Sequence, residues 1–365
     1  MKDSKIRRIG ILTGGGDCPG LNGVLRAVVK TCRFEYGIDV VGIEDGYGGL
    51  INDRMRTLTS DDVSGILARG GTILGSSNKD NPFRVPVSEG GEVAFKDLSD
   101  QAIKNAQQHG LELLIVVGGD GSLNIAYELS KKGLPIVGVP KTIDNDLDAT
   151  DVTFGFDTAL STATDAADKL HTTADSHHRL MVLELMGRYA GWIALEAGMA
   201  GGGDVILIPE IPFDMEKVDQ AIRERRYRGR KFAVVVVAEG AAPKGGEMMV
   251  DRRITDSTDA VRLGGIGRWV AEELERRLNW EARTTVLGHL QRGGTPTAFD
   301  RLLATRFGVE AVRLVATGQH GRMVSLHGTT IDSVTLEEAV VRLRRVDPES
   351  QIVQAARAVG TSFGD

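Results

Sequence analysis

The sequence predicts an α/β fold with two doubly wound lobes and mostly parallel sheets, and three observations indicate it. Short apolar runs rich in β-branched residues recur along the chain, and helical patterns separate most of them. These runs are continuously apolar, which is typical of strands that helices cover on both faces. The length of 365 residues suits two domains. The predicted strands are IGIL (9–12), VVGI (40–43), LLIVV (113–117), PIVGV (135–139), LMVLEL (180–185), VILI (205–208) and FAVVVVA (232–238), with 180–240 as a candidate second βαβ set.

Composition and charge narrow the class of protein. Glycine supplies 46 residues and proline only 10, so the excess glycine indicates tight turns and backbone-lined pockets rather than disorder. The formal net charge is −6 and the basic residues are dispersed, which argues against nucleic acid as the main partner. An anionic ligand must therefore be met by local groups.

The chain shows features of a cytoplasmic protein. No apolar run approaches the ~18 residues of a membrane span, and the N-terminal residues enter a strand pattern without the apolar region of a signal peptide. The spacing of Cys18 and Cys32 suits neither a CxxC motif nor a disulfide framework. We expect two reduced thiols and no membrane partner.

The first predicted strand is followed by the glycine-rich turn TGGGDCPGLNG (13–23), which leads into a helical pattern. Ligands of open α/β sheets bind beyond the carboxyl ends of the strands, so chemistry is expected here. Gly15 and Gly16 expose amide hydrogens at a helix N-terminus, which predicts an anion site. Neither a Walker loop nor a GxGxxG fingerprint is present, and a purely structural turn is the alternative.

A second glycine turn, GGDGSLNIAYEL (118–129), follows the strand at 113–117. Asp120 stands beside the exposed amides of this turn, Gly121 follows it, and Ser122 is a candidate N-cap. A carboxylate beside exposed amides suggests a bound phosphate with Mg²⁺. A bare capping turn is the alternative.

A third turn, PKTIDNDLDATD (140–151), follows the strand at 135–139 and packs four carboxylates into eight residues. One carboxylate can accept the proton of a hydroxyl while another helps to bind metal-bound phosphate, and a lysine and a threonine precede them. Asx turns of a surface loop are the alternative. The residues are Lys141, Thr142, Asp144, Asp146, Asp148 and Asp151.

The motifs GGGDCPGLN, GGDGS, PKTIDND, MGR (186–188) and GHLQRGG (288–294), in this order, resemble the phosphofructokinase family from about residue 6 to about residue 325. The resemblance implies phosphorylation of fructose 6-phosphate at its 1-hydroxyl in a cleft between two Rossmann-like lobes. It places the phosphoryl-donor lobe at 1–155 and 291–341. The fructose 6-phosphate lobe is then 156–290 and 342–365, with an insertion around 240–266.

The resemblance also implies a role for each residue near the transferred group. Asp144 is the expected general base for the sugar hydroxyl, and such a base is typically worth ~10² to 10⁴ in rate. Asp120 is the expected Mg²⁺ ligand, with Asp146 as a second carboxylate near the metal. Thr142 is expected to hydrogen-bond the phosphoryl group and Arg188 to stabilise the charge on its oxygens.

The sugar phosphate needs a cationic clamp, because guanidinium groups match phosphate oxygens. The resemblance assigns this clamp to Arg179, Arg283, His289 and Arg292, and assigns contacts with the sugar to Met186, Gly187 and Glu239. In the family, the counterparts of Arg179 and Arg283 come from a neighbouring subunit, which implies a homo-oligomer, either a tetramer or a dimer. Without the resemblance, the two arginines would be interpreted as surface charges and His289 as a loop histidine.

The donor in this family is ATP or pyrophosphate, and two positions discriminate between them. Gly121 is the ATP-type residue, since an aspartate there would block and repel the nucleotide. Lys141 is the residue of pyrophosphate users, but it neutralises phosphate oxygens and can swing aside. Steric exclusion is the stronger constraint, so ATP is expected, as in a known subgroup with this combination, and pyrophosphate is the alternative. Asn78 stands where bacterial ATP enzymes carry an arginine, so Asn78 and Lys79 are expected beside the nucleotide, with Arg84 as a substitute cation.

The motifs predict the reaction more specifically than they predict regulation or exclude other functions. Arg26 and Lys30 share a helix face where bacterial relatives bind an allosteric nucleotide or phosphoenolpyruvate, although a solvated basic face is the alternative. The polar segment 240–266 is the best candidate for an insertion or a mobile loop. NAD kinases and lipid kinases also contain a GGDG turn, but we expect them to lack MGR and GHLQRGG. A catalytically silent sugar-phosphate sensor is a remote alternative.

Overall fold

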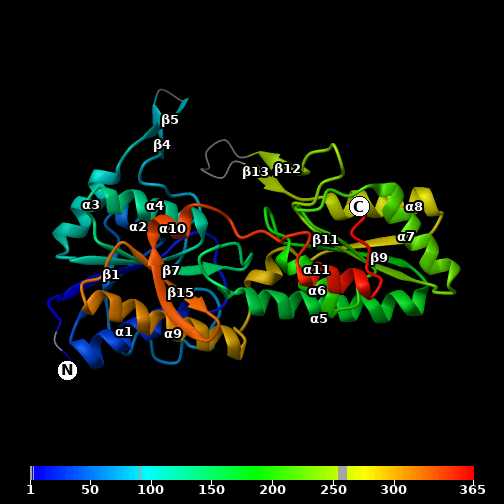
Figure 1. Cartoon of the computed structure of the whole chain (residues 1–365). Coiled ribbons are helices and arrows are strands. Elements are labelled where there is room, and N and C mark those ends of the chain that lie inside the picture. The colour runs from blue at the N-terminus through cyan, green and yellow to red at the C-terminus, as the bar shows by residue number, and fades with distance from the viewer. Residues whose placement is uncertain (1, 3, 90–91, 254–260) are drawn as a thin grey trace.

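An eight-stranded sheet occupies one side of the computed structural model, which describes residues 2, 4–89, 92–253 and 261–365 (Figure 1). Its strands are β1 (Arg8–Thr13), β2 (Asp39–Ile43), β3 (Met55–Leu58), β6 (Leu113–Gly118), β7 (Ile136–Thr142), β8 (Phe154–Gly155), β15 (Arg322–His327) and β16 (Thr330–Thr335). The order is β16-β15-β7-β6-β1-β2-β3, with the short β8 paired to β7. The neighbours from β15 to β2 are parallel, and the edge strands β3 and β16 are antiparallel to their partners.

A second, fully parallel sheet lies beside the first (Figure 1). Its order is β10-β11-β9-β14, and its strands are β9 (Leu180–Leu185), β10 (Val205–Leu207), β11 (Ala233–Ala238) and β14 (Ala282–Val286). The predicted α/β class with mostly parallel sheets is confirmed. The seven predicted strands correspond to β1, β2, β6, β7, β9, β10 and β11, and the second βαβ set is present.

Helices cover both faces of the first sheet, as its continuously apolar strands predict. On β6, Ile115 and Val117 pack into one core while Leu114 and Val116 pack into another, and all four are fully buried. Burial of each such side chain contributes about 1.5–3 kcal/mol. One face is covered by α1 (Leu21–Thr31) and α9 (Ala298–Ala316), and the other by α2 (Tyr47–Ile51), α3 (Ser99–Gln108), α4 (Asp120–Lys131) and α10 (Leu336–Val340).

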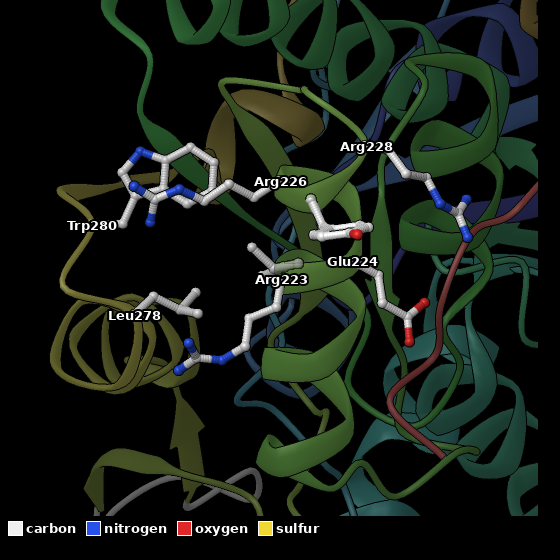
Figure 2. Close-up of a pocket in the computed structure, with 8 residues that line it drawn as sticks. Arg223, Glu224, Arg226, Arg228, Leu278 and Trp280 are labelled. Atoms are coloured by element: carbon white, nitrogen blue, oxygen red, sulfur yellow. The ribbon is translucent and has the colours of Figure 1, made fainter.

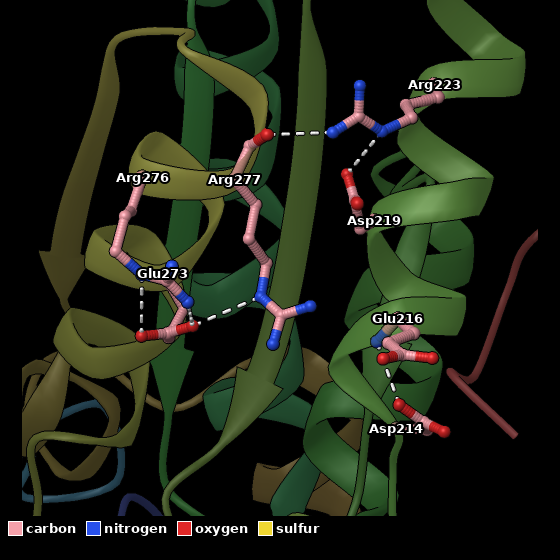
Figure 3. Close-up of polar contacts among 7 residues, drawn as sticks. All are labelled: Asp214, Glu216, Asp219, Arg223, Glu273, Arg276 and Arg277. Atoms are coloured by element: carbon pink, nitrogen blue, oxygen red, sulfur yellow. Dashed lines mark hydrogen bonds and ion pairs between the residues drawn. The ribbon is translucent and has the colours of Figure 1, made fainter.

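The second sheet is covered in the same way, and one core continues from sheet to sheet. The helices α5 (Phe156–His177), α6 (Trp192–Ala200) and α11 (Gln351–Ala358) belong to the core that also contains α1 and α9. The helices α7 (Met215–Tyr227) and α8 (Ile266–Leu278) cover the opposite face. Arg223 donates from Nη2 to the carbonyl of Arg277 at 2.7 Å and pairs with Asp219, which joins α7 to α8 at the surface (Figure 3).

The strands that the sequence did not predict are short, polar or at edges. The β4 (Val85–Glu89) and β5 (Glu92–Lys96) hairpin and the antiparallel β12 (Val250–Arg253) and β13 (Val261–Leu263) ribbon extend from the sheets (Figure 1). Parts of the segment 240–266, the candidate insertion or mobile loop, form β12 and β13, and residues 254–260 at its centre lie outside the described residues, so its assignment as an insertion stays a prediction. Two further turns, the π-helical η1 (Cys32–Tyr36) and the 3₁₀ η2 (Gly288–Arg292), complete the elements.

Cys18 and Cys32 are both buried and free, as predicted. Arg26 and Lys30 both lie on α1, and the Lys30 ammonium stands 5.9 Å from the centre of the Phe34 ring. A role for these two cations in effector binding stays a prediction. Among the described residues, no helix combines the length and the apolar character of a bilayer crossing.

Two helix N-termini meet between the sheets and share their side chains. The fully buried carboxylate of Asp300, in the first turn of α9, accepts hydrogen bonds from Gly155 N at 2.9 Å and from Thr158 N at 2.8 Å. It also accepts the Thr158 hydroxyl at 2.5 Å. In return, the Thr297 hydroxyl donates to Asp157 Oδ2 in the first turn of α5 at 2.6 Å. The α9 carboxylate therefore accepts amides at the start of α5 that have no partner within their own helix, and hydroxyl-to-carboxylate bonds link the two helices in both directions.

Asp300→Ala is expected to lower the free energy of unfolding by about 2–4 kcal/mol, because it leaves buried donors of α5 without an acceptor. Urea denaturation followed by circular dichroism measures the loss. Asp332→Ala is the matched control, since Asp332 is exposed and its side chain accepts from the adjacent Ser333 amide. A loss for Asp300→Ala no larger than that of the control would contradict the role of this junction.

Candidate active site

The glycine turn after β1 is joined to the loop that contains Asn78 and Lys79. Gly15 N donates to the Ser77 carbonyl at 3.0 Å, and the Ser76 hydroxyl donates to the Gly15 carbonyl at 2.5 Å. Gly15 has a φ of 80°, a left-handed conformation that favours glycine. Asn78 and Lys79 are exposed beside this turn, as their predicted nucleotide-side position requires. Arg84 instead stacks on the Phe95 ring at 4.3 Å, on the β4–β5 hairpin.

The second glycine turn presents Asp120 as the first residue of α4, where Asn124 Nδ2 donates to its Oδ1 at 3.0 Å. Ser122 was expected to be an N-cap, and this was wrong, because the N-cap is Gly119 and Ser122 is the third helical residue. The buried Ser122 side chain packs under the glycine turns. A Cβ on Gly14 would lie 2.7 Å from its Oγ, and a Cβ on Gly118 would lie 2.3 Å from its Cβ.

Gly121 differs from these packed glycines. It is exposed, and apart from its chain neighbours and the backbone of its own helix, no described atom lies within 4 Å of a Cβ built on it. Its φ is not in the left-handed region, so its backbone does not require glycine either. Open space therefore adjoins the second residue of α4, immediately after Asp120.

The third turn brings two carboxylates together after β7. Asn145 adopts a φ of 51°, and its side chain accepts from Thr153 N at 3.1 Å, which stabilises this left-handed residue between Asp144 and Asp146. Asp144 N donates to the Thr142 hydroxyl at 3.1 Å. The Oδ1 atoms of Asp144 and Asp146 are buried, and neither finds a hydrogen-bond donor in the part of the chain that the structure describes. Unpartnered buried carboxylate oxygens are costly unless a ligand pairs with them.

The electrostatics of this turn show which groups share the site. The pKa of Asp146 is raised to about 7, mainly by burial and then by the neighbouring Asp144 and Asp120, while the Thr142 hydroxyl opposes the shift. Burial also raises the pKa of Asp144, against the attraction of nearby cations, Arg292, Lys141 and Arg188. Perturbed carboxyl groups of this kind cluster at functional sites.

Lys141 is held inside the site rather than free. Its Nζ donates to the Gly16 carbonyl at 2.5 Å, and the residue is only 3% exposed. Burial lowers the pKa of its ammonium. In this conformation the tip of Lys141 is buried and hydrogen-bonded to the first glycine turn, and its ability to swing aside for a nucleotide stays a prediction.

The second sheet contributes groups from the carboxyl ends of β9 and β11. Gly187 and Arg188 follow β9, and Glu239 follows β11, with Glu239 N donating to the Leu185 carbonyl at 2.8 Å. Burial raises the pKa of Glu239 to about 7, with Asp144 as the next largest cause, so the two sheets meet at these carboxylates. The Arg188 guanidinium stacks on Tyr189 at 5.3 Å and opposes the rise at both carboxyl groups.

The loop after β14 adds Arg292, whose Nη1 donates to the Asp17 carbonyl in the first glycine turn at 3.0 Å. His289 lies exposed on the same 3₁₀ turn, and Met186 is partly buried against the core. These positions agree with the expected sugar-phosphate contacts, which stay predictions.

Arg179 and Arg283 are not brought to this site. Arg179 directly precedes β9 and Arg283 pairs with Met181 near the start of that strand, about 20 Å along its six residues from Gly187. Both guanidinium groups bind Glu281, at 2.7 Å from Arg179 Nε, on the surface. Within one chain they therefore face away from Asp144.

The sequence analysis missed Glu184, which is 3% exposed inside β9. Its Oε2 accepts from Gly267 N at the start of α8 at 2.8 Å, and its charge raises the pKa of Glu239. The signal was available, since Glu184 is the only charged residue within the apolar run LMVLEL.

A separate pocket of about 590 Å³ lies at the carboxyl-terminal ends of α7 and α8. Figure 2 shows the Arg226 guanidinium there over the Trp280 ring, 4.9 Å from the ring centre. None of the site residues described above lines this pocket. The candidate active site is therefore the meeting point of strand ends, not this surface cavity.

Comparisons with known proteins agree on one family. A family model described as phosphofructokinase matches residues 8–315. The chain is 53% identical over 362 residues to ATP-dependent 6-phosphofructokinase 2 of Clostridium perfringens, with 99% of each chain covered. It is 53% identical over 342 residues to the pyrophosphate–fructose 6-phosphate 1-phosphotransferase of Streptomyces coelicolor, over 93% of this chain and 96% of that one. The solved phosphofructokinase of Saccharomyces cerevisiae superposes with a TM-score of 0.76 at 32% identity, over 92% of this chain and 45% of that longer chain.

Asp146→Asn is expected to stabilise the protein in a pH-dependent way. Folding raises the pKa of Asp146 from 3.8 to about 7, so the wild type loses stability as the pH rises between these values. The variant avoids this loss, and its advantage should grow from near zero at pH 4 to about 1–3 kcal/mol above pH 7. Urea denaturation at pH 4.5 and pH 8 measures it, with Asp148→Asn as control, because Asp148 is partly exposed and pairs with Arg342. A gain that does not depend on pH would contradict the explanation.

Proposed function

The chain belongs to the phosphofructokinase family, and on that premise we propose that it transfers the terminal phosphoryl group of ATP to the 1-hydroxyl of fructose 6-phosphate. The products are fructose 1,6-bisphosphate and ADP. The observation that supports this most is the convergence of Asp144, Asp120 and the open space at Gly121 where the strand ends meet. A base, a metal-binding carboxylate and room for a nucleotide are the parts that the reaction needs.

Asp144 is the proposed general base. It accepts the proton of the sugar 1-hydroxyl as the bond from that oxygen to phosphorus forms and the bond to the leaving ADP oxygen breaks. Its raised pKa strengthens it as a proton acceptor near neutral pH. The hydrogen bond from the backbone Asp144 N fixes the Thr142 side chain in the same turn.

The charge that develops on the transferred group requires cations. Arg188 lies close enough to Asp144 and Glu239 to stabilise both carboxylates, so its guanidinium is placed at the same point of the site. The Thr142 hydroxyl and the Lys141 ammonium lie on the other side, at the end of β7. These three groups stabilise negative charge on the phosphoryl oxygens in the transition state.

A Mg²⁺ ion fits the carboxylates of this site. Asp144 and Asp120 add to the cost of ionising Asp146, and buried oxygens of Asp144 and Asp146 lack donors in the described structure. Mg²⁺ prefers one or two carboxylates together with substrate phosphates, so Asp120 would hold it with help from Asp146. The bound ion supplies charge neutralisation of the donor phosphates.

Lobe boundaries and location complete the proposal. We place the donor lobe at 1–155 and 291–341 and the sugar lobe at 156–290 and 342–365, in line with the two sheets and with α9, β15 and β16 joining the first. The tail joins the second, where Ile206 N donates to the Ser362 carbonyl at 2.9 Å. We expect the enzyme to work in the cytoplasm, where its substrates occur.

The donor is argued from Gly121, because relatives named for either donor reach 53% identity. Gly121 has neither a packing reason nor a backbone reason to be glycine, so its missing Cβ serves a ligand. Lys141 bonds to Gly16 instead of filling that space. An ATP molecule can therefore extend past Asp120, which a pyrophosphate-specific site has no need to allow.

Gly121→Asp is expected to reduce kcat/KM for ATP by at least about 100-fold, because a carboxylate beside Asp120 blocks and repels the nucleotide. The affinity for fructose 6-phosphate should change less than about threefold, since the sugar lies on the other sheet. A coupled spectrophotometric assay with ATP and with pyrophosphate as donors measures both constants. Turnover of the wild type with pyrophosphate and not with ATP would overturn the proposal, and equal loss of sugar binding in the variant would contradict the steric argument.

Arg179 and Arg283 are proposed to complete the sugar-phosphate site of a neighbouring subunit, with His289, Arg292, Glu239, Met186 and Gly187 contributed by the subunit itself. Their distance from Asp144 within one chain supports this shared site and a homo-oligomer.

Mixing subunits tests the shared site. Asp144→Asn and Arg283→Ala are each expected to be nearly inactive, with fructose 6-phosphate binding retained in Asp144→Asn. Co-refolded in equal amounts, they should recover about a quarter of wild-type activity, because half of the dimeric pairs are hybrids with one intact site of two. Asp144→Asn mixed with His289→Ala is the matched control, since both changes affect the same chain's site and no hybrid site is intact. Recovery in neither mixture, or in both, would contradict a site shared through Arg283.

A further inference from the structure

The chain returns from the first sheet to the second through a short extended segment, residues 342–346, which we call the strap. After α10 it passes the catalytic turn and continues to α11 in the second lobe, and Figure 1 shows it as the orange to red trace between the two sides. Neither the motifs nor the proposed mechanism assigns it a role. Its contacts, however, reach both halves of the active site.

On the first side, the strap binds the turn that contains the catalytic base. Arg344 N donates to the Asp146 carbonyl at 2.8 Å, and Leu343 forms an antiparallel bridge with Leu147. The Arg342 guanidinium forms an ion pair with Asp148. The strap therefore pairs its backbone with residues 146 and 147, which directly follow the turn that contains Asp144.

On the side of the second sheet, Arg344 of the strap binds Trp192, which follows the turn that contains Arg188. Trp192 Nε1 donates to the Arg344 carbonyl at 3.1 Å, and the Arg344 guanidinium stacks on the Trp192 ring, 4.4 Å from its centre. Trp192 is the first residue of α6, four positions after Arg188, and is only 9% exposed. The backbone N–H and C=O of Arg344 thus connect the turn after β7 with the first residue of α6.

Glu210 reinforces this connection from the second sheet. Its Oε1 accepts from Val346 N at 2.8 Å, and both of its carboxylate oxygens accept from Gly191 N, at 3.0 and 3.1 Å. A Cβ on Gly191 would lie 2.4 Å from Ile208 Cβ and 2.9 Å from Glu210 Oε2, so the glycine permits close packing against both residues. The strap, the Arg188 turn and the start of α6 form one hydrogen-bonded unit.

The cost of this arrangement indicates a purpose beyond packing. Arg344 Nη1 is buried, and it has no hydrogen-bond partner in the described part of the chain. An apolar side chain at this position would avoid the cost of desolvating a guanidinium group. What the arginine supplies instead is orientation, since a planar cation over an indole fixes both partners.

We propose that Arg344 and Trp192 are positioning residues that hold Asp144 and Arg188 at a fixed separation for phosphoryl transfer. This inference rests on the proposed function and goes beyond it, since neither side chain touches the reacting atoms. Misplacement of a catalytic group by about 1 Å can cost ~10²-fold in rate, so a loosened link acts on kcat. Substrate affinity depends on other groups and is expected to stay.

Single substitutions that remove one part of the link test the proposal. Trp192→Phe keeps an aromatic ring but loses the N–H donor, and Arg344→Met keeps the length of the side chain but loses the charge. Each is expected to lower kcat at least about tenfold with both KM values within about threefold of wild type. Arg344→Lys retains a cation over the ring and should recover most of kcat. Trp269→Phe is the matched control on α8, away from the strap, and should keep wild-type kcat.

A second measurement separates positioning from a general structural effect. If Trp192 acts through the placement of Arg188, then Trp192→Phe should cost less than about threefold in kcat when Arg188 is already lysine, because the effects of coupled residues are not additive. Wild-type kcat in both Trp192→Phe and Arg344→Met would overturn the proposal, as would equal fold-losses in both backgrounds. Should Trp192→Phe fail to fold, the Arg344 variants decide in the same way. Retained activity of Asp144→Asn would instead overturn the proposed function itself.

Discussion

Three partly buried carboxyl groups lie close together where the two sheets meet. The repulsion between their like charges is the constraint on which the site depends. Asp144, Asp146 and Glu239 all have raised pKa values because burial removes the water that would stabilise their charges. Lys141 at the end of β7, Arg188 after β9 and Arg292 on η2 lie close enough to oppose this rise at Asp144. Because a buried carboxylate is costly unless a cation pairs with it, these cations are what makes ionisation of the group possible.

The sequence predicted those parts of the site that are local to one turn. Glycines, the aspartate at the start of α4 and the PKTIDND turn follow strands directly, so their place at the carboxyl edge of a parallel sheet follows from the strand prediction alone. Glu239 and Arg292 came only from the resemblance, because nothing local marks them. Ser122 was misassigned as a cap because a serine near a helix start has the same local pattern whether it faces solvent or packs under a glycine.

Contacts between residues that lie far apart in the sequence could not be predicted from the sequence. Lys141 bonds to a carbonyl 125 residues away, and Asp300 satisfies donors 142 and 145 residues away, so no spacing along the chain announces either contact. The polar edge strands were missed for a related reason. β14 and β16 are stabilised by pairing with a neighbour rather than by a continuous apolar run, so their residues alternate in burial or stay half exposed.

The lobes are coupled by polar junctions as well as by packing. A shared hydrophobic core joins α1 and α9 to α5 and α6, but apolar packing tolerates small shifts of one layer over another. Hydrogen bonds are directional, and two of them cross between the lobes: Thr158 N donates to Asp300, and Arg344 N donates to the Asp146 carbonyl. Glu210 then ties the strap to the second sheet. Since a buried donor that loses its acceptor is costly, these junctions restrict the relative position of the sheets more narrowly than the core does. If Asp144 is the base and Arg188 the guanidinium of the proposed reaction, that reaction depends on a few polar contacts that touch no substrate.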